Sequence, residues 1–466
     1  MDQLSCLQNS FASWMNRTDA VSLVQQSYDD AATLFKIPYR VDLHTPSDVM
    51  GSLTGSAWVT SRANGDATPA KPPGSPPGEG DTRDSIIGSS TLLSALGVRP
   101  MMDVMWTSPI QPGDPYNCNG VGSSTLDCTF LNDVTNMSQW SIRQNIQRDL
   151  LVATLSAGPV GIGDMVGGTD LQMLRPVLNM ASIILKPAHP FLRLNRYYTG
   201  DTASVFTAVS VPARSSSASV DRRANSISRL TPLNGSTDSP DAIWWHMLLS
   251  TENAPGPSLK NVSVGELWPT PPPMAAFLAT WAFGWPMAAA APAVGCVHGA
   301  KPAACLSLVD AANPLSLATA KAVPQTPQIN TLAFRHLVLA PVLPSGWVLV
   351  GELGKFVPVS PQRFLVHDNS SHASGTDMGS DACRPREITN GGAGLAFGLL
   401  GSHGEAVSVT VVAPAPRTDS NGMALSAAAR AMAGTVLVVE TTIGASGKAD
   451  VVCAASACHV GGVHLS

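Results

Sequence analysis

Residues 150–164, with the sequence LLVATLSAGPVGIGD, decide the fold that we expect for this chain. The apolar run at 150–153 predicts a buried β-strand, which breaks at glycines and Pro159 and ends at Asp164. Residues 171–178 then carry apolar residues at helical spacing. A buried strand followed by a small-residue loop, an acid and a helix is a unit from which α/β proteins build the wall of a site. A dinucleotide-binding loop is the alternative, but the third glycine of its pattern would fall on Val166.

Length and charge narrow the class of protein. The chain has 466 residues, enough for two domains, and its net charge of −5 gives no electrostatic basis for nucleic-acid binding. The first residues, MDQL, lack the basic and apolar regions of a secretory signal peptide. An uncharged run at 274–297 has about the length of a membrane span, but Pro286 and Pro292 interrupt it. We therefore expect no membrane span, and the oligomeric state stays open.

The eight cysteines are informative through their spacing. Six of them form close pairs, none with the C-x-x-C spacing typical of zinc sites. Close pairs favour local disulfides and thus the secretory pathway or the extracellular space, whereas unpaired thiols in a cytosolic protein are the alternative. Five N-x-S/T sequons point in the same direction. The pairs are Cys118/Cys128, Cys296/Cys305 and Cys453/Cys458.

Strand and helix patterns alternate in the first part of the chain. Strands are predicted at 39–43, 57–60, 101–106 and 150–153, each followed by a loop and a helix-like segment. Four such βα units predict the C-terminal half of a (β/α)8 TIM barrel over residues 1–190, with a Pro/Gly insertion at 67–84. Short apolar runs separated by turn residues predict an antiparallel β-sandwich over 191–466, with a Pro/Ala-rich insertion at 268–330.

The candidate site follows from this architecture, because active sites of such barrels lie at the carboxyl ends of the strands. Seven polar or aromatic residues are placed there by the predicted strands: Asp42, His44, Arg62, Asp66, Asp103, Trp106 and Asp164.

Three segments of the same region resemble a known family. DSIIGSSTLLSALGVRPMMDVMWTS, LLVATLSAGPVGIGD and IILKPAHP are similar to the last barrel strands of family 36 glycoside hydrolases, the α-galactosidases and raffinose synthases. YYTGDTASVFTAVSV, GELWPTPPP and FRHLVLAPVLPSGWVLVGELGKFVPVSPQRF look like the β-domain of an uncharacterised eukaryotic branch. The Gly-Pro-Val-Gly…Asp and Asp-x-x-Trp-Thr motifs are the most specific parts. The resemblance implies a carbohydrate substrate and no cofactor or metal.

The resemblance also implies a chemistry with two carboxylates, held roughly 5–5.5 Å apart in retaining enzymes. Asp2, in a remnant of a Gln-Asp-Trp-Leu-like motif, is the candidate nucleophile, and Asp66 is the candidate acid/base, oriented by Arg62. The expected activity is a retaining double displacement on α-linked galactosides or related oligosaccharides. Two departures oppose it: Asn64-Gly65-Asp66 stands where relatives carry Ser-Asp-Asp, and no strand precedes Asp2. A truncated chain, a non-catalytic carbohydrate-binding remnant and a gene-model fragment are therefore the alternatives.

The substrate-binding candidates have structural alternatives too. Asp164 either contacts sugar hydroxyls or caps the following helix, and Asp103 either binds substrate or forms a buried ion pair. Trp106 either stacks on a sugar ring or belongs to the core. His44 is expected to be a polar rim residue, with a catalytic role as the alternative, and the alternative for Arg62 is a structural salt bridge.

Overall fold

The computed structural model describes most of the chain after residue 150 and short segments before it. The described residues are Asp30, Leu34, 39–42, 58–62, 99–101, 107, 147–148, 150–164, 166–195, 203–215, 244–252, 259–285, 296–318, 334–367, 386–388, 394–418, 420–454 and 457–460.

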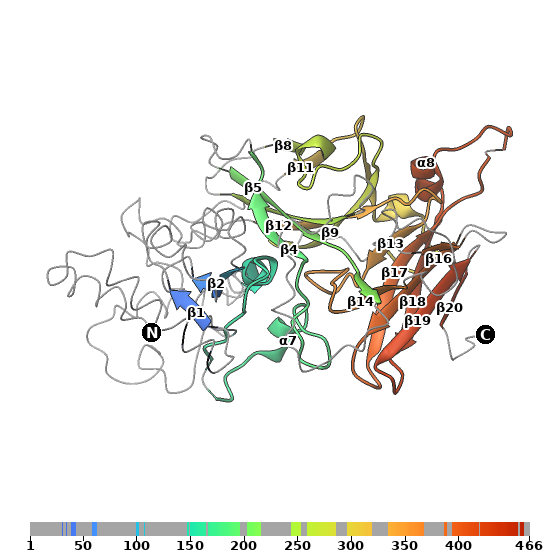
Figure 1. Cartoon of the computed structure of the whole chain (residues 1–466). Coiled ribbons are helices and arrows are strands. Elements are labelled where there is room, and N and C mark those ends of the chain that lie inside the picture. Colours follow the sequence, from blue (N-terminus) through green and yellow to red (C-terminus); the bar gives the residue numbers. More distant parts are fainter. Residues whose placement is uncertain are drawn as a thin grey trace, which may run out of the picture.

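A six-stranded antiparallel sheet, the central sheet, occupies the middle of the described chain (Figure 1). Residues 268–330, which composition set apart as an insertion, supply two of its strands. In spatial order the strands are β10 (Ser307–Val309), β9 (Phe277–Trp285), β12 (Phe334–Pro341), β7 (Trp245–Glu252), β5 (Ala203–Ser210) and β4 (His189–Arg193).

Both faces of the central sheet are buried. Alternation along β7 sends Met247 and Leu249 into one core, together with helical residues 150–155, and sends Leu248 into the other. The second core also takes residues from the small antiparallel pair β8 (Leu259–Val262) and β11 (Leu315–Ala318). Two covered faces explain why these strands are nearly continuous apolar runs.

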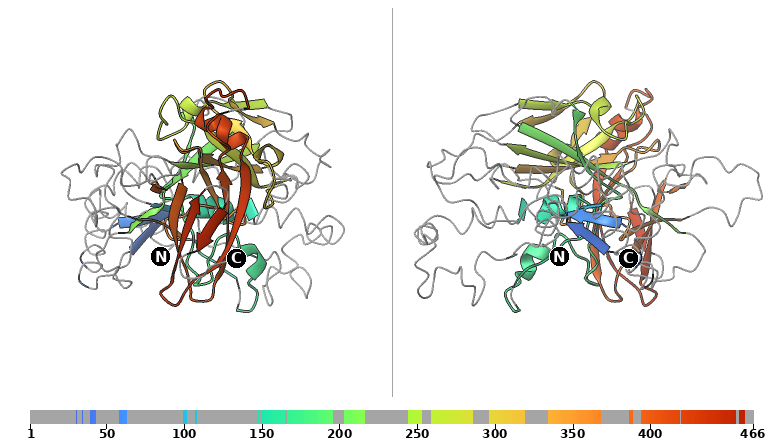
Figure 2. Two further views of the ribbon diagram at one scale, coloured as in Figure 1. Left: turned by 90° about the vertical axis from the view of Figure 1, so that its right-hand side faces the viewer. Right: turned by 60° about the vertical axis from the view of Figure 1, so that its left-hand side comes forward.

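Two further sheets form the C-terminal part, and Figure 2 shows them face to face. Their facing side chains form one large buried core that includes Trp347, Phe364 and Phe397. The first sheet has the order β13 (Val348–Gly351), β17 (Ala406–Ala413), β18 (Thr435–Thr442). The second has the order β20 (Ala457–Val460), β19 (Lys448–Ala454), β16 (Gly394–Leu400), β14 (Phe364–His367), β6 (Ala213–Ser215), and β15 (Arg386–Ile388) also pairs with β16. The remaining elements are α7 (Leu171–Leu174), α8 (Ala427–Met432) and the short 3-10 helices η3 (Val264–Glu266) and η6 (Pro302–Ala304).

Three short parallel strands precede this β-rich part: β1 (Tyr39–Asp42), β2 (Trp58–Arg62) and β3 (Arg99–Met101). They confirm the first two predicted strands and place the third slightly earlier than expected. Asp42 pairs with Arg62, and Arg62 pairs with Met101, so the three strands end in register.

The predicted fold class, an α/β half barrel followed by a sandwich, is wrong. The described chain consists mainly of antiparallel sheets, and the fourth expected barrel strand is a helix: residues 150–155 are helical. Thr154 Oγ1 donates back to the carbonyl of Leu150 at 2.7 Å, one helical turn earlier. This helix is buried on every side, so its sequence shows no amphipathic period and resembles a buried strand.

Two expectations about the chemistry of the chain can be compared with the structure. The pairs Cys296–Cys305 and Cys453–Cys458 form disulfides, while Cys118 and Cys128 lie outside the described residues. Among the residues that are described, no helix is long and apolar enough to cross a membrane, and part of the uncharged run at 274–297 is strand β9.

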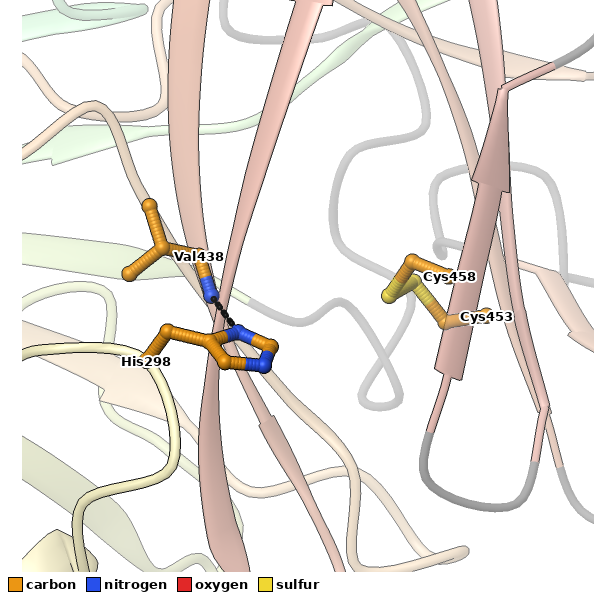
Figure 3. The surroundings of a disulfide bond; sticks show 4 residues. All are labelled: His298, Val438, Cys453 and Cys458. Carbon is orange, nitrogen blue, oxygen red and sulfur yellow. Dashed lines mark hydrogen bonds between the residues drawn. A yellow bond between two sulfur atoms is a disulfide. The ribbon is translucent and has the colours of Figure 1, made fainter. Parts of the chain in front are cut away.

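The segment after Cys296 covers the outer edge of β18. Val438 donates its N–H to Nδ1 of His298 at 3.3 Å (Figure 3), and Val436 donates to the carbonyl of Ala300 at 2.9 Å. Cys296 is nearly buried and its disulfide closes this segment into a loop. The disulfide therefore protects a sheet edge that would otherwise offer unpaired backbone groups.

We predict that the double variant Cys296→Ser/Cys305→Ser loses about 2–3 kcal/mol of stability, because the closed loop no longer restricts the unfolded chain. It should also aggregate on heating as the edge of β18 opens, which light scattering during a thermal melt will measure. The matched control is Cys453→Ser/Cys458→Ser, whose loop is shorter and whose strands β19 and β20 remain paired through their backbones. Equal scattering from both variants would contradict the edge-protecting role.

Two fully buried histidines lie on neighbouring strands of the central sheet. His246 is on β7 and His336 is on β12, and the strand register sends them to opposite faces. The ring of His246 is 5.5 Å from that of Phe277, and the ring of His336 is 6.4 Å from that of Phe356. Burial lowers the pKa of each histidine from 6.5 to about 3, so both are neutral near pH 7.

We predict that the protein loses stability as the pH falls from about 6.5 toward 3. The native state then binds fewer protons than the unfolded state, which costs about 1.4 kcal/mol per pH unit for each histidine. Urea unfolding at several pH values should show a reduced slope for His246→Leu and for His336→Leu. The exposed His403 provides the control, and a slope unchanged in both buried-site variants would rule out this origin of acid sensitivity.

Candidate functional site

The contact between Thr107 and Asp164 joins two distant parts of the chain. The amide of Thr107 donates to Oδ1 of Asp164 at 2.8 Å, and the Thr107 hydroxyl donates to Oδ2. Thr107 is buried, whereas Asp164 is half-buried. A carboxylate has roughly four acceptor positions, so these two bonds fix the direction of the others. Thr107 closes the Asp-x-x-Trp-Thr motif, and Asp164 closes the Gly-Pro-Val-Gly…Asp motif.

Asp170 completes this arrangement and excludes one alternative for Asp164. Its backbone N–H donates to Oγ1 of Thr107 at 2.7 Å, so the hydroxyl both donates and accepts. Its side chain accepts from the amide of Gln172 at 2.9 Å and caps α7. The helix that follows Asp164 is therefore capped by Asp170, and the capping alternative for Asp164 is wrong.

The other predicted site residues are placed only in part. Arg62 is the last residue of β2, at the aligned ends of the three parallel strands. The structure describes its backbone but not its side chain. Asp2, His44, Asp66, Asp103 and Trp106 lie outside the described residues. Their expected roles therefore remain predictions.

The segment after α7 is held against the C-terminal sheets by polar contacts. Lys355 Nζ donates to the carbonyls of Arg175 and Leu178 at 2.7 and 2.6 Å, beyond the end of α7. Phe356 donates its amide to the carbonyl of Pro176 at 2.9 Å. A lysine at the end of a helix satisfies carbonyls that have no partner within the helix.

A buried cluster of charges continues this contact. Nε of Arg363 lies 2.8 Å from Glu352, its other end pairs with Glu405, and it also donates to the carbonyl of Leu400. Glu405 in turn accepts from the amide of Met180 at 3.0 Å. All three charged side chains are nearly inaccessible to solvent. We call Glu352, Lys355, Arg363 and Glu405 the charged latch.

The two carboxylates of the latch are affected in opposite directions. Burial raises the pKa of Glu352, and the nearby charges of Arg363 and Lys355 offset this effect only in part. Burial also acts to raise the pKa of Glu405, but hydrogen bonds from Arg363 and from two backbone amides outweigh it and lower that pKa. One guanidinium shared by two buried carboxylates leaves the one with fewer donors poorly stabilised.

Sequence reasoning missed Thr107 and the latch. Thr107 is the last residue of the Asp-x-x-Trp-Thr motif, but its role depends on two tertiary partners, Asp164 and Asp170, which lie 57 and 63 residues away in the sequence. Three of the four latch residues lie within GELGKFVPVSPQRF, where the usable signal is charged residues inside an otherwise apolar, turn-rich segment, and Glu405 lies further along the chain. Comparison with known proteins adds no further residues: no model of a protein family matches the chain, and no curated protein is significantly similar to it.

We predict that Arg363→Met destabilises the protein by about 3–5 kcal/mol at pH 7, because two buried carboxylates lose their cation. The pKa values of both carboxyls then rise above their unfolded values, so the loss should shrink as the pH is lowered toward 5. Urea unfolding of the variant and of the wild type at both pH values measures the difference.

The exposed Arg417→Met is the control and should change stability little. Adding Glu352→Gln to Arg363→Met should restore part of the lost stability at pH 7. A loss that does not depend on pH would mean that Arg363 acts through packing alone.

Proposed function

We propose that this protein acts on α-linked galactosides or related oligosaccharides as a retaining glycoside hydrolase-like protein. The observation that carries the proposal is the pair of hydrogen bonds between Thr107 and Asp164. These residues belong to the two motifs that most specifically resemble family 36 glycoside hydrolases. Motifs 57 residues apart that meet through a carboxylate support a common site.

Asp164 has properties that suit it to binding sugar hydroxyls. Its carboxylate is half-buried and oriented through both oxygens, so a ligand hydroxyl meets an acceptor of fixed direction. Binding sites rely on a few polar groups placed in this way. Arg62, which ends β2 in register with β1 and β3, is a further proposed substrate-binding residue. His44, Asp103 and Trp106 are the further proposed substrate-binding residues.

The proposed chemistry uses two carboxyl groups. The carboxylate of Asp2 attacks the anomeric carbon while the carboxyl of Asp66 donates its proton to the departing glycosidic oxygen. The glycosidic bond breaks, and an ester between Asp2 and the sugar forms. Water then attacks the anomeric carbon, gives its proton to Asp66 and releases Asp2, which restores both groups.

The two disulfides support a location in the secretory pathway or outside the cell. We propose this location together with the activity.

We predict that the protein hydrolyses nitrophenyl α-galactoside and that Asp66→Asn lowers kcat at least 100-fold, since general acid catalysis contributes about that much or more. Asp164→Asn should instead raise KM about tenfold, because a neutral amide is a weaker acceptor for sugar hydroxyls.

Asp170→Asn is the matched control for Asp164→Asn. It removes the same charge from the same loop, and asparagine caps a helix as well as aspartate does. It should leave KM unchanged. Galactoside binding without turnover, unaffected by Asp66→Asn, would favour the non-catalytic carbohydrate-binding alternative, and neither binding nor turnover would refute the proposal.

A further inference from the structure

Three aromatic rings, which we call the row of rings, are joined by two contacts that both involve His189. His189, at the start of β4, stands between the two tryptophans: its ring centroid is 5.5 Å from that of Trp244 and 6.1 Å from that of Trp268. The contact between His189 and Trp268 is edge-to-face, with the planes at 84°. Trp244 is buried, His189 is half-buried and Trp268 is 41% exposed. The row thus runs from the protein interior to solvent.

The exposure of Trp268 is set by a firmly anchored segment. The residue before it, Leu267, is 2% exposed, and Pro271 shortly after it is also buried. Upstream, the side chain of Glu266 accepts from both the amide and the hydroxyl of Ser263 and closes a capping box around η3. The indole is therefore presented to solvent from a fixed backbone and is braced by His189.

A braced, exposed indole beside an imidazole suits a particular kind of ligand. A sugar ring has an apolar face of C–H groups and a rim of hydroxyls, so it covers a flat aromatic surface while its rim meets polar ring nitrogens. A rigid two-torsion side chain such as tryptophan loses little conformational entropy on contact. A proline-rich peptide also packs on tryptophan, but it relies on an aromatic-lined groove.

We propose that Trp268 and His189 form a stacking platform for a pyranose unit of the carbohydrate substrate. This inference rests on the proposed function, since it takes the ligand class from there. The platform belongs to β4 and the segment around η3, whereas Asp164 belongs to the loop before α7. Trp268 provides the flat face, His189 braces it, and Trp244 supports His189 from the interior.

Affinity electrophoresis of the full chain in galactomannan gels, with raffinose titration by calorimetry, tests the platform. Trp268→Ala should weaken retention by galactomannan about tenfold, while Trp268→Phe, which keeps a flat ring, should lose less. Met274→Ala is the control, because Met274 is 93% exposed on the same stretch but is outside the row of rings. His189→Ala should weaken retention to an intermediate degree. Thermal melts should show that Trp268→Ala is still folded at the temperature of the binding experiments, so that weaker retention is not caused by unfolding.

Each outcome separates the platform from the proposed activity. Retention that depends on Trp268 supports the platform even if nitrophenyl α-galactoside is not hydrolysed, in which case the proposed activity fails alone. Hydrolysis of that small substrate together with retention that is indifferent to Trp268 overturns the platform alone. Absence of retention in the wild type, or binding of a polyproline peptide in place of both sugars, also overturns it.

Discussion

The ion cluster around Arg363 is the constraint on which the rest of the structure depends. A guanidinium with two carboxylates is placed where solvent is nearly absent, and such a group is tolerated only when its hydrogen bonds are satisfied. Backbone groups complete these hydrogen bonds. Arg363 donates to a carbonyl on β16, and Glu405 accepts from an amide of the segment after α7. Because its partners come from separate elements, the cluster specifies how these elements dock, which apolar contacts alone do not do.

The burial of both faces of the central sheet is a second constraint on the sequence. With both faces covered, residues 245–250 of β7 and most residues of β12 are buried, including the two histidines. The two histidines lie at fully buried positions of this sheet, and burial keeps them neutral near pH 7. Acid sensitivity is thus a consequence of the architecture, and it arises far from the polar contacts of Asp164.

Some of this structure could be predicted from sequence. The strands β5, β12, β13, β17 and β18 coincide with short apolar runs bounded by turn residues, where the local pattern and the tertiary structure agree. Residues 150–155 could not be assigned in this way, because a helix buried on all sides and a buried strand share the same composition. For the site, the sequence motif indicated Asp164 as a candidate, and its role stays a prediction. Thr107 and Asp170 could not be, since their roles arise only when residues 57 and 63 positions apart meet.

The position of Asp164 depends on the C-terminal sheets through a short chain of contacts. The helix α7 has four residues, too few to be stable on its own. It is held at its start by the cap of Asp170 and beyond its end by Lys355, which reaches two carbonyls from the loop after β13. Asp170 in turn donates to the Thr107 hydroxyl that orients Asp164. Apolar packing of Val177 with Phe356 and Val357 accompanies these hydrogen bonds, so the latch and the core together hold the segment that leads back to the carboxylate. The charged residues of the latch therefore help to define the site, although none of those contacts includes Asp164 itself.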